Sequence, residues 1–153
     1  MYTIGVIADT HGLMRPAALA ALQGSTLIMH AGDIGAPEVL SALAVIAPVV
    51  AVRGNNDRGT WAEALPETAT VAVGTCRLYV LHDVKSLTID PQAAGVQVVI
   101  AGHSHHPLVV ERQGVLFVNP GSAGRRRFKL PVTVARLSIG AQALQAELIT
   151  LDV

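Results

Sequence analysis

The sequence predicts a single α/β domain, and three observations lead to this fold class. The chain has 153 residues, of which 51% are hydrophobic and only 14% are charged, so it can bury a core without disulfide bonds. Its first third alternates short apolar runs with helix-type segments. The rest contains paired apolar runs that are separated by glycine turns. No linker, repeat or low-complexity segment divides the chain, so we expect one domain over residues 1–153.

The N-terminal segments predict parallel βαβ units. Residues 3–8, 26–30 and 49–52 form apolar runs typical of strands that are covered on both faces. Pro16 opens an alanine- and leucine-rich helix that Gly24 closes, and Pro37 opens a second helix that runs to about residue 47. Proline is well tolerated at the first helical position. Strand and helix therefore alternate in the order expected of a parallel sheet.

The remaining segments predict three hairpins and one further strand. The hairpins pair residues 68–73 with 76–81, 108–111 with 115–118, and 132–138 with 143–151, each around a glycine turn. A short helical or irregular piece at residues 91–94 precedes a strand at 96–101. We thus expect a parallel half followed by an antiparallel half.

The composition indicates which partners and which cellular compartment to expect for this protein. Eleven basic residues balance eleven acidic ones, so no stable nucleic-acid partner and no membrane-surface partner is expected. Cys76 is the only cysteine, which excludes an intramolecular disulfide and fits a reducing, cytoplasmic location. The N-terminus lacks the basic region of a signal peptide, and the longest apolar run, residues 43–52, is broken by Pro48 and too short to span a membrane. The basic run at residues 125–129 is interpreted as a solvated loop, with phosphate recruitment as the alternative.

Metal-binding residue types occur in the loops that directly follow five of the predicted strands. In α/β sheets, ligands gather at the carboxyl ends of strands, where the loops converge. Carboxylate, amide and imidazole donors without a thiolate suit first-row divalent metals. The sequence has more candidate ligands than one metal ion needs, which indicates two ions that share a carboxylate. The candidates are Asp9, His11, Asp33, Asn55, Asp57, His82, His103 and His105.

The spacing of these residues agrees with such a site. Asp9 and His11 are two apart, so in an extended segment both side chains point the same way. Asp33 follows a glycine that lets the backbone bend. His103 and His105 could face one metal together or serve one metal each. Two ions about 3.5–4 Å apart can neutralise phosphate oxygens and activate a water, so no serine or cysteine nucleophile is required.

Taken in order, these motifs resemble those of the calcineurin-like metallophosphoesterases, and in particular the small YfcE-type phosphodiesterases. The resemblance rests on ordered blocks that run from residue 9 to residue 122. These are Asp9-Thr-His11, Gly32-Asp33, Gly54-Asn55-Asn56-Asp57, His82, Gly102-His103-Ser-His105 and Asn119-Pro-Gly-Ser122.

The resemblance implies a four-layer αββα sandwich, in which helices flank two mixed β-sheets, and a dinuclear metal centre. It assigns Asp9, His11 and His105 to one metal and Asn55, His82 and His103 to the other, with Asp33 as the bridge. Asp33, Asn55 and His103 are then the catalytic candidates. The implied cofactor is two divalent cations, Mn²⁺ first, with Ni, Fe, Zn or Mg as alternatives.

Residues around the ligands are given supporting roles. Asn56 and His106 are expected at the substrate, and Asp57 and Asn119 are expected to orient ligands from behind. His30 is expected to support the loop of Asp33 rather than to bind metal. Two departures from the family pattern are visible: Asn56 stands where many relatives have a proton-donating histidine, and Asp83 follows His82 where relatives often have His-Gly-His.

The sequence therefore predicts a metal-dependent phosphodiesterase that hydrolyses small phosphate esters with a metal-activated hydroxide. A phosphomonoesterase of the same chemistry is one alternative. A catalytically weak scaffold for protein partners is the other, since a retromer subunit has this fold and binds partners with it. Exposed hairpins could supply a homodimer interface.

Overall fold

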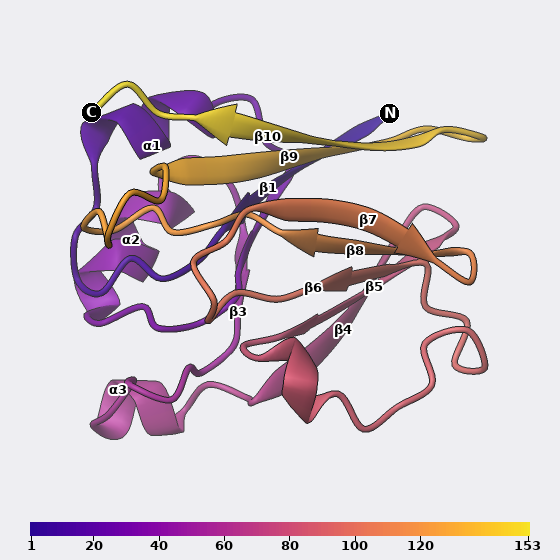
Figure 1. The fold of residues 1–153 in the computed structure, drawn as a ribbon, viewed down its shortest axis with the longest axis horizontal. Helices are drawn as coiled ribbons and strands as arrows, with labels where there is room; N and C mark the ends of the chain where they lie inside the picture. Colours follow the sequence, from indigo (N-terminus) through magenta and orange to yellow (C-terminus); the bar gives the residue numbers. More distant parts are fainter.

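A computed structural model describes residues 1–153 as two five-stranded β-sheets packed face to face (Figure 1). In the first sheet the strand order is β10-β9-β1-β2-β3. Its strands are β1 (Tyr2–Ile7), β2 (Leu27–His30), β3 (Val49–Ala51), β9 (Thr133–Ile139) and β10 (Leu144–Thr150). In the second sheet the order is β4-β5-β6-β8-β7. Its strands are β4 (Thr68–Val73), β5 (Cys76–Leu81), β6 (Val98–Ile100), β7 (Leu108–Arg112) and β8 (Val115–Asn119).

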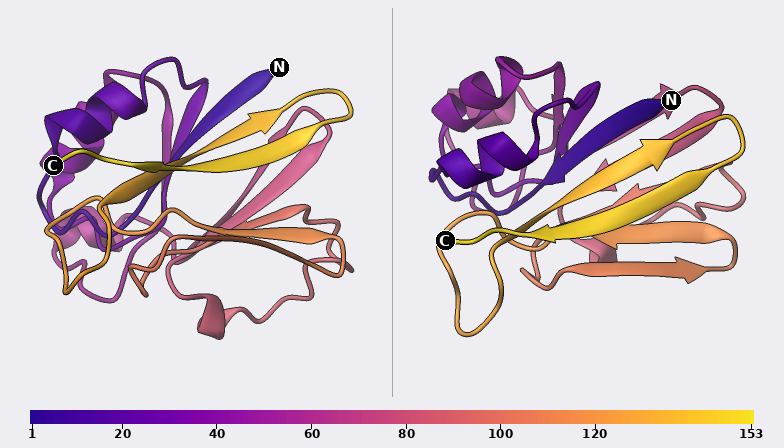
Figure 2. Two further views of the ribbon diagram at one scale, coloured as in Figure 1. Left: turned by 45° about the horizontal axis from the view of Figure 1, so that its top comes forward. Right: turned by 90° about the horizontal axis from the view of Figure 1, so that it is seen from above.

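The first sheet confirms the predicted βαβ units. β1 pairs in parallel with β2 and β2 with β3, while β9 and β10 add an antiparallel hairpin at the other side of β1. The connecting helices α1 (Pro16–Ala21) and α2 (Pro37–Ala44) each begin at a proline. Both cover the outer face of this sheet, where Leu22, Val39 and Leu43 are buried against it (Figure 2).

The second sheet is mixed, as the family resemblance implies, whereas the hairpin pattern alone indicated an antiparallel half. The three predicted hairpins form as expected. However, β5 pairs in parallel with β6, and β6 pairs in parallel with β8. The reason is that the chain between β5 and β6, and between β6 and β8, is long enough for a crossover connection, which parallel pairing requires.

The layers follow the predicted αββα order, with a thin fourth layer. A core of buried aliphatic side chains fills the space between the sheets. The outer face of the second sheet is covered by the segment from the 3₁₀ turn η1 (Val84–Ser86) to residue 97, whose Leu87 and Ile89 pack on Tyr79 and Val99. Residues 91–94 form turns, and a short helix, α3 (Thr60–Glu63), was not predicted. The structure contains no helix that is long and apolar enough to cross a membrane.

This arrangement brings the strand-end loops of both sheets together. Within each sheet the loops are tied by backbone hydrogen bonds, from Asp9 N to Gly32 O (3.0 Å) and from Gly102 N to His82 O (2.9 Å). Between the sheets, the backbone N–H of His103 donates to Asp9 Oδ2 at 3.0 Å. The carboxyl ends of the parallel strands therefore meet at one edge of the sandwich.

Candidate metal centre

The predicted ligands lie on loops with an unusual backbone conformation. Five of them have a positive φ, namely Asp9 (55°), His11 (46°), Asp33 (54°), His103 (72°) and His105 (63°). Residues with a side chain rarely adopt this left-handed conformation, and such strained positions cluster at functional sites. The conformation turns each side chain out of the strand direction at the edge where the loops converge.

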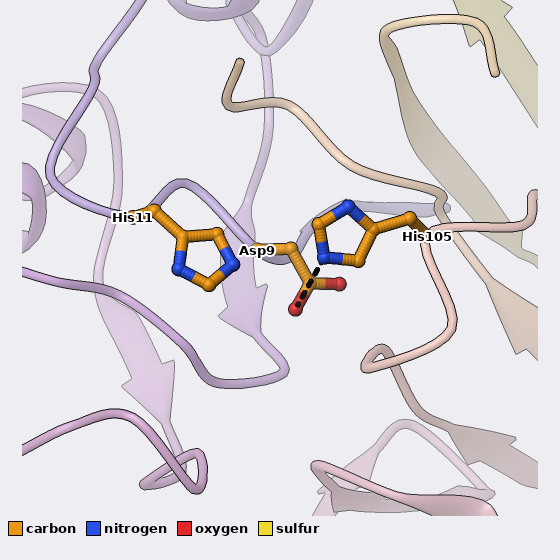
Figure 3. Close-up of side chains that lie close together, drawn as sticks. All are labelled: Asp9, His11 and His105. Carbon is orange, nitrogen blue, oxygen red and sulfur yellow. Dashed lines mark ion pairs between the residues drawn. The ribbon is translucent and has the colours of Figure 1, made fainter. Parts of the chain in front are cut away.

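Asp9, His11 and His105 form the first of two ligand groups, here called triad 1 (Figure 3). One possible ligand atom from each lies within 4.8 Å of the others. Asp9 and His105 are buried, whereas His11 is exposed. His105 Nε2 is 3.7 Å from Asp9 Oδ1, too far for a hydrogen bond.

Asp33, His82 and His103 form the second group, triad 2, with the same 4.8 Å limit on their ligand atoms. His82 Nδ1 donates to the carbonyl of Ala31 at 2.8 Å, which leaves Nε2 as its ligand atom. This Nε2 lies 3.3 Å from Asp33 Oδ2 and 3.2 Å from His103 Nδ1. Asn55 joins the group through its side-chain oxygen, 3.2 Å from His103 Nδ1.

Asp33 lies between the two groups. The same oxygen, Oδ2, is 3.3 Å from His82 Nε2 in triad 2 and 3.7 Å from His11 Nε2 in triad 1. The glycines around it are required by close packing, because a Cβ on Gly54 would collide with the backbone and carboxylate of Asp33. One carboxylate thus has access to both positions, which is the arrangement that the sequence predicts for a bridge.

The donor atoms of both triads fit divalent cations. In triad 1, Asp9 Oδ1 and His105 Nδ1 are buried without a hydrogen-bond partner, although buried polar atoms are nearly always satisfied. In triad 2, the possible ligand atoms form one cluster, in which His82 Nε2, His103 Nδ1 and the side-chain oxygens of Asp33 and Asn55 each lie 3.2 or 3.3 Å from another member. A cation held by Asp9 Oδ1 and His105 Nε2 in triad 1 would give the unpartnered carboxylate oxygen a partner, and the N/O donors of both triads suit first-row metals.

The two carboxylates have opposite electrostatic environments in the protein without metal. Burial raises the pKa of Asp9 to about 7, although the nearby His82 opposes this rise. Burial also acts to raise the pKa of Asp33, but the hydrogen bonds from His82 and from Asn56 N outweigh it and lower the pKa to about 2. The two groups therefore carry different charges at neutral pH before any metal binds.

The imidazoles also differ. Burial lowers the pKa of His105 to about 4, and the positive charge of Arg127 acts in the same direction. For His82, burial disfavours the charged form, yet Asp33 and the carbonyl of Ala31 together raise its pKa. His105 is thus a neutral donor at physiological pH.

The residues expected behind the ligands hold the loops in place. Asp57 accepts hydrogen bonds from three backbone N–H groups, those of Ile34 (3.2 Å), Gly35 (2.9 Å) and Gly54 (2.8 Å). Asn119 donates to Gly102 O at 3.0 Å and to Ser104 Oγ at 3.1 Å, which fixes the histidine loop.

His30 has the supporting position that was expected of it. It accepts from Gly32 N at 3.1 Å and lies 3.0 Å from Thr10 Oγ1, which donates to Ile34 O at 2.8 Å. The strand-end loops of β1 and β2 are therefore joined by a buried hydrogen-bond network.

The two residues expected at the substrate lie in different places. Asn56 contacts Asp33 directly, because its backbone N–H and its Nδ2 donate to the two carboxylate oxygens at 2.9 and 3.2 Å. His106 is exposed and lines a side cavity of about 280 Å³ behind the histidine loop. The substrate roles of both residues remain predictions.

The open cavity at triad 2 is larger and strongly polar. Its volume is about 660 Å³, and Asn55, His82 and His103 line its inner end. Of its 13 lining residues only Leu81 is hydrophobic. The remainder of the lining includes two arginines, three carboxylates and three hydroxyl side chains, so the cavity is suited to a hydrophilic, hydroxyl-rich ligand. These residues are Arg53, Arg58, Asp57, Glu67, Asp83, Thr68, Ser86 and Thr88.

One residue of the site was missed by the sequence analysis. Asp83 Oδ2 lies 3.7 Å from His103 Nε2, on the side of the imidazole opposite to Asn55. A carboxylate behind a metal-binding histidine commonly fixes its orientation. The signal was present in the sequence, where Asp83 was noted only as a departure at a strand end.

Comparison with known proteins agrees with this site. Residues 2–142 match the family model of the calcineurin-like phosphoesterase superfamily domain. A probable metallophosphoesterase of Methanothermobacter thermautotrophicus is 34% identical, over 95% of this chain and 91% of its own. One from Methanocaldococcus jannaschii is 32% identical, over 97% of this chain and 81% of its own.

Solved structures share the fold at lower identity. A structure described as a novel archaeal phosphodiesterase superposes with a TM-score of 0.79 at 21% identity, over 96% of this chain and 99% of its own. Vps29 of Entamoeba histolytica, solved with Zn²⁺, gives a TM-score of 0.73 at 23% identity, over 97% and 98%. Both establish that the chain has the same fold as these proteins.

Proposed function

The chain belongs to the calcineurin-like phosphoesterase superfamily, and from this premise we propose that it is a metal-dependent phosphodiesterase for small phosphate esters. The observation that carries the proposal is the complete pair of N/O triads with Asp33 between them. Triad 1 and triad 2 would each hold one divalent cation, with Asn55 added to the second. When bound, such a pair neutralises phosphate oxygens and activates a water for attack on phosphorus. Water then adds to phosphorus, one P–O ester bond breaks, and the alcohol leaves with a proton.

The residues of the chain support a diester with a good leaving group. Asn56 is a poor proton donor, and its Nδ2 is already bonded to Asp33. The protein thus offers no imidazole at this position to protonate a departing alkoxide, so the proton must come from water. Leaving groups that need little protonation, such as aryl alcohols, should therefore be the fastest.

The polar cavity supports a small hydrophilic ester. Arg53 and Arg58 offer positive charge, although Arg53 is paired with Glu67 at 3.0 Å. Three hydroxyl side chains offer hydrogen bonds to a sugar or polyol. We assign the cavity to the arm of the ester that carries such groups.

Hydrolysis of bis-p-nitrophenyl phosphate tests the enzyme proposal. We expect turnover with Mn²⁺ or Ni²⁺ and loss of turnover with EDTA. Comparison with p-nitrophenyl phosphate separates a diesterase from a monoesterase. If the metal-loaded protein cleaves neither compound, the protein is not a phosphoesterase.

A second candidate is a scaffold that binds protein partners through this fold. It is favoured by the likeness to Vps29 of Chaetomium thermophilum, which was solved with a cyclic peptide and has a TM-score of 0.70 at 19% identity. Fewer than one Mn²⁺ per chain after loading would favour the scaffold. Because Vps29 of Entamoeba histolytica was solved with Zn²⁺, a metal-loaded protein that shows no hydrolysis would favour it as well. Manganese as the native ion, a cytoplasmic location and a homodimer also stay predictions.

A further inference from the structure

The loop between β8 and β9 carries the strongest concentration of charge in the chain. Arg125, Arg126, Arg127 and Lys129 surround Phe128, and no acidic residue occurs between Glu111 and Glu147. All five side chains of residues 125–129, here called the basic loop, are exposed. The balanced total charge of the protein conceals this local excess, which the function proposed above does not use.

The basic loop begins at the metal centre. Ser122 Oγ donates to Asp9 O at 3.1 Å, and Ala123 N donates to Ala8 O at 3.1 Å. A Cβ on Gly124 would overlap the backbone of Asp9 and Thr10, so the chain leaves triad 1 in close contact with it. Figure 2 shows the segment between β8 and β9 extending from there away from both sheets, beside the C-terminus.

The side chains of the loop are available to a ligand. Arg126 donates to the carbonyl of Val153 at 3.2 Å, whereas the other three cations make no hydrogen bond or ion pair within the chain. Phe128 is 88% exposed and has a φ of 55°, a conformation that a bulky residue rarely adopts. An aromatic ring held in solvent between cations is the combination that binds single-stranded nucleic acids, where bases stack on rings and cations follow the phosphates.

The loop and the polar cavity adjoin different triads of the metal centre. The cavity opens at triad 2, and the loop leaves from triad 1. A phosphodiester at the centre has two ester arms, one for the cavity and one for the loop. If one arm continues as a chain of phosphodiesters, its next phosphates would run along the cations of the loop.

We propose that the basic loop binds the sugar–phosphate backbone of a single-stranded oligonucleotide, with a base stacked on Phe128, and presents its end to the metal centre. This inference rests on the proposed phosphodiesterase function and extends its substrate class. An anionic membrane is disfavoured as the ligand because Phe128 and the half-exposed Val153 beside the loop bury little apolar area, and the other exposed large apolar side chains lie elsewhere in the chain. Binding is transient, since three cations give only modest affinity at physiological salt.

Fluorescence anisotropy with a labelled single-stranded 12-mer, in EDTA to prevent cleavage, tests the inference. We expect log Kd to rise with log salt concentration with a slope of about 2, since each phosphate contact on a single strand contributes about 0.7. Neutralising Arg125, Arg127 or Lys129 to Gln should lower the slope by about 0.7 each. The matched control is Arg112→Gln, at the far end of β7 from the metal centre, which should not change the slope.

The stacking contact has its own test. Phe128→Ser should weaken binding by at least about fivefold, the lower limit for loss of one base–aromatic stack. Val45→Ser removes another almost fully exposed apolar side chain and should leave Kd unchanged. Thermal melting and metal content of each variant check that the fold and the centre are intact.

Failure of the oligonucleotide-binding inference can be distinguished from failure of the proposed phosphodiesterase function. Hydrolysis of bis-p-nitrophenyl phosphate by the wild-type protein tests that function, whereas oligonucleotide binding in EDTA tests the loop alone. Equal effects of the loop variants and the Arg112 control would overturn the inference. So would tight binding to phosphatidylserine vesicles without binding to the oligonucleotide, which would make the loop a membrane contact.

Discussion

The two triads contain the same kinds of donor but differ in how the protein satisfies them. Triad 1 is mostly buried and leaves the ligand atom Asp9 Oδ1 without a hydrogen-bond partner. Triad 2 faces the polar cavity, and each of its donors contacts another side chain. Burial without a partner is unfavourable until a cation arrives. We therefore expect triad 1 to gain more from metal binding, and we expect the ion at triad 2 to be more accessible to solvent and substrate.

The largest effect that we expect is the effect of Asp9 on the stability of the metal-free protein. Its pKa is raised to about 7 from an unfolded value of 3.8, so folding favours the protonated form. The protonated Asp9 therefore contributes to the free energy of unfolding below pH 4. This contribution, up to about 4 kcal/mol, is lost as the pH rises through 7. Asp9→Asn should thus stabilise the metal-free protein at pH 8 and have little effect at pH 4.

Urea unfolding of both proteins in EDTA at the two pH values measures this difference. Asp33→Asn is the matched control, because the pKa of Asp33 is lowered to about 2. Its stabilising contribution is present above pH 3.8 and lost as the pH falls through 2, so the substitution should destabilise at pH 8. The same sign for both variants at pH 8 would contradict the contrast between the two carboxylates.

Hydrolysis should respond most strongly to Asp33, since its Oδ2 contacts both triads. In Asp33→Asn we expect a loss of more than about 100-fold in kcat/KM for bis-p-nitrophenyl phosphate, beyond the 10- to 100-fold typical of residues behind the ligands. Asn119→Ala, behind the histidine loop, should fall within that smaller range. Equal losses in the two variants would argue against a bridging role.

The difference between the triads should also determine which of them binds metal more tightly. Titration calorimetry with Mn²⁺ should show two steps, the tighter one at triad 1. His105→Ala should then remove the tight step and His103→Ala the weak one, although both variants lose hydrolysis. Loss of the tight step in His103→Ala would reverse the assignment of the two positions.

The sequence was sufficient to predict which residues lie together in the two triads and insufficient to predict this difference between the triads. Strand-end positions and residue types identified all six members of the triads because parallel strands must deliver their loops to one edge. Burial and partner atoms depend on how the two sheets pack, which local patterns do not contain. The same limit explains why the hairpin pattern alone indicated an antiparallel half, since an apolar run looks alike in a hairpin strand and in the parallel strands β5, β6 and β8.

Substitution of Asp83 should have the smallest effect on metal affinity, and this effect should be confined to triad 2. Asp83 Oδ2 lies 3.7 Å from His103 Nε2, the ring nitrogen that does not contact Asn55 or His82. If it holds the imidazole in position, Asp83→Asn should weaken only the second Mn²⁺ step, by about tenfold, and Asp83→Glu should restore part of the loss. The carboxylate is 32% exposed, so a purely electrostatic contribution would be screened and would decline with added salt. A tenfold loss that persists at high salt, with the first step unchanged, therefore identifies Asp83 as a positioning residue of triad 2, whereas equal weakening of both steps would refute that role.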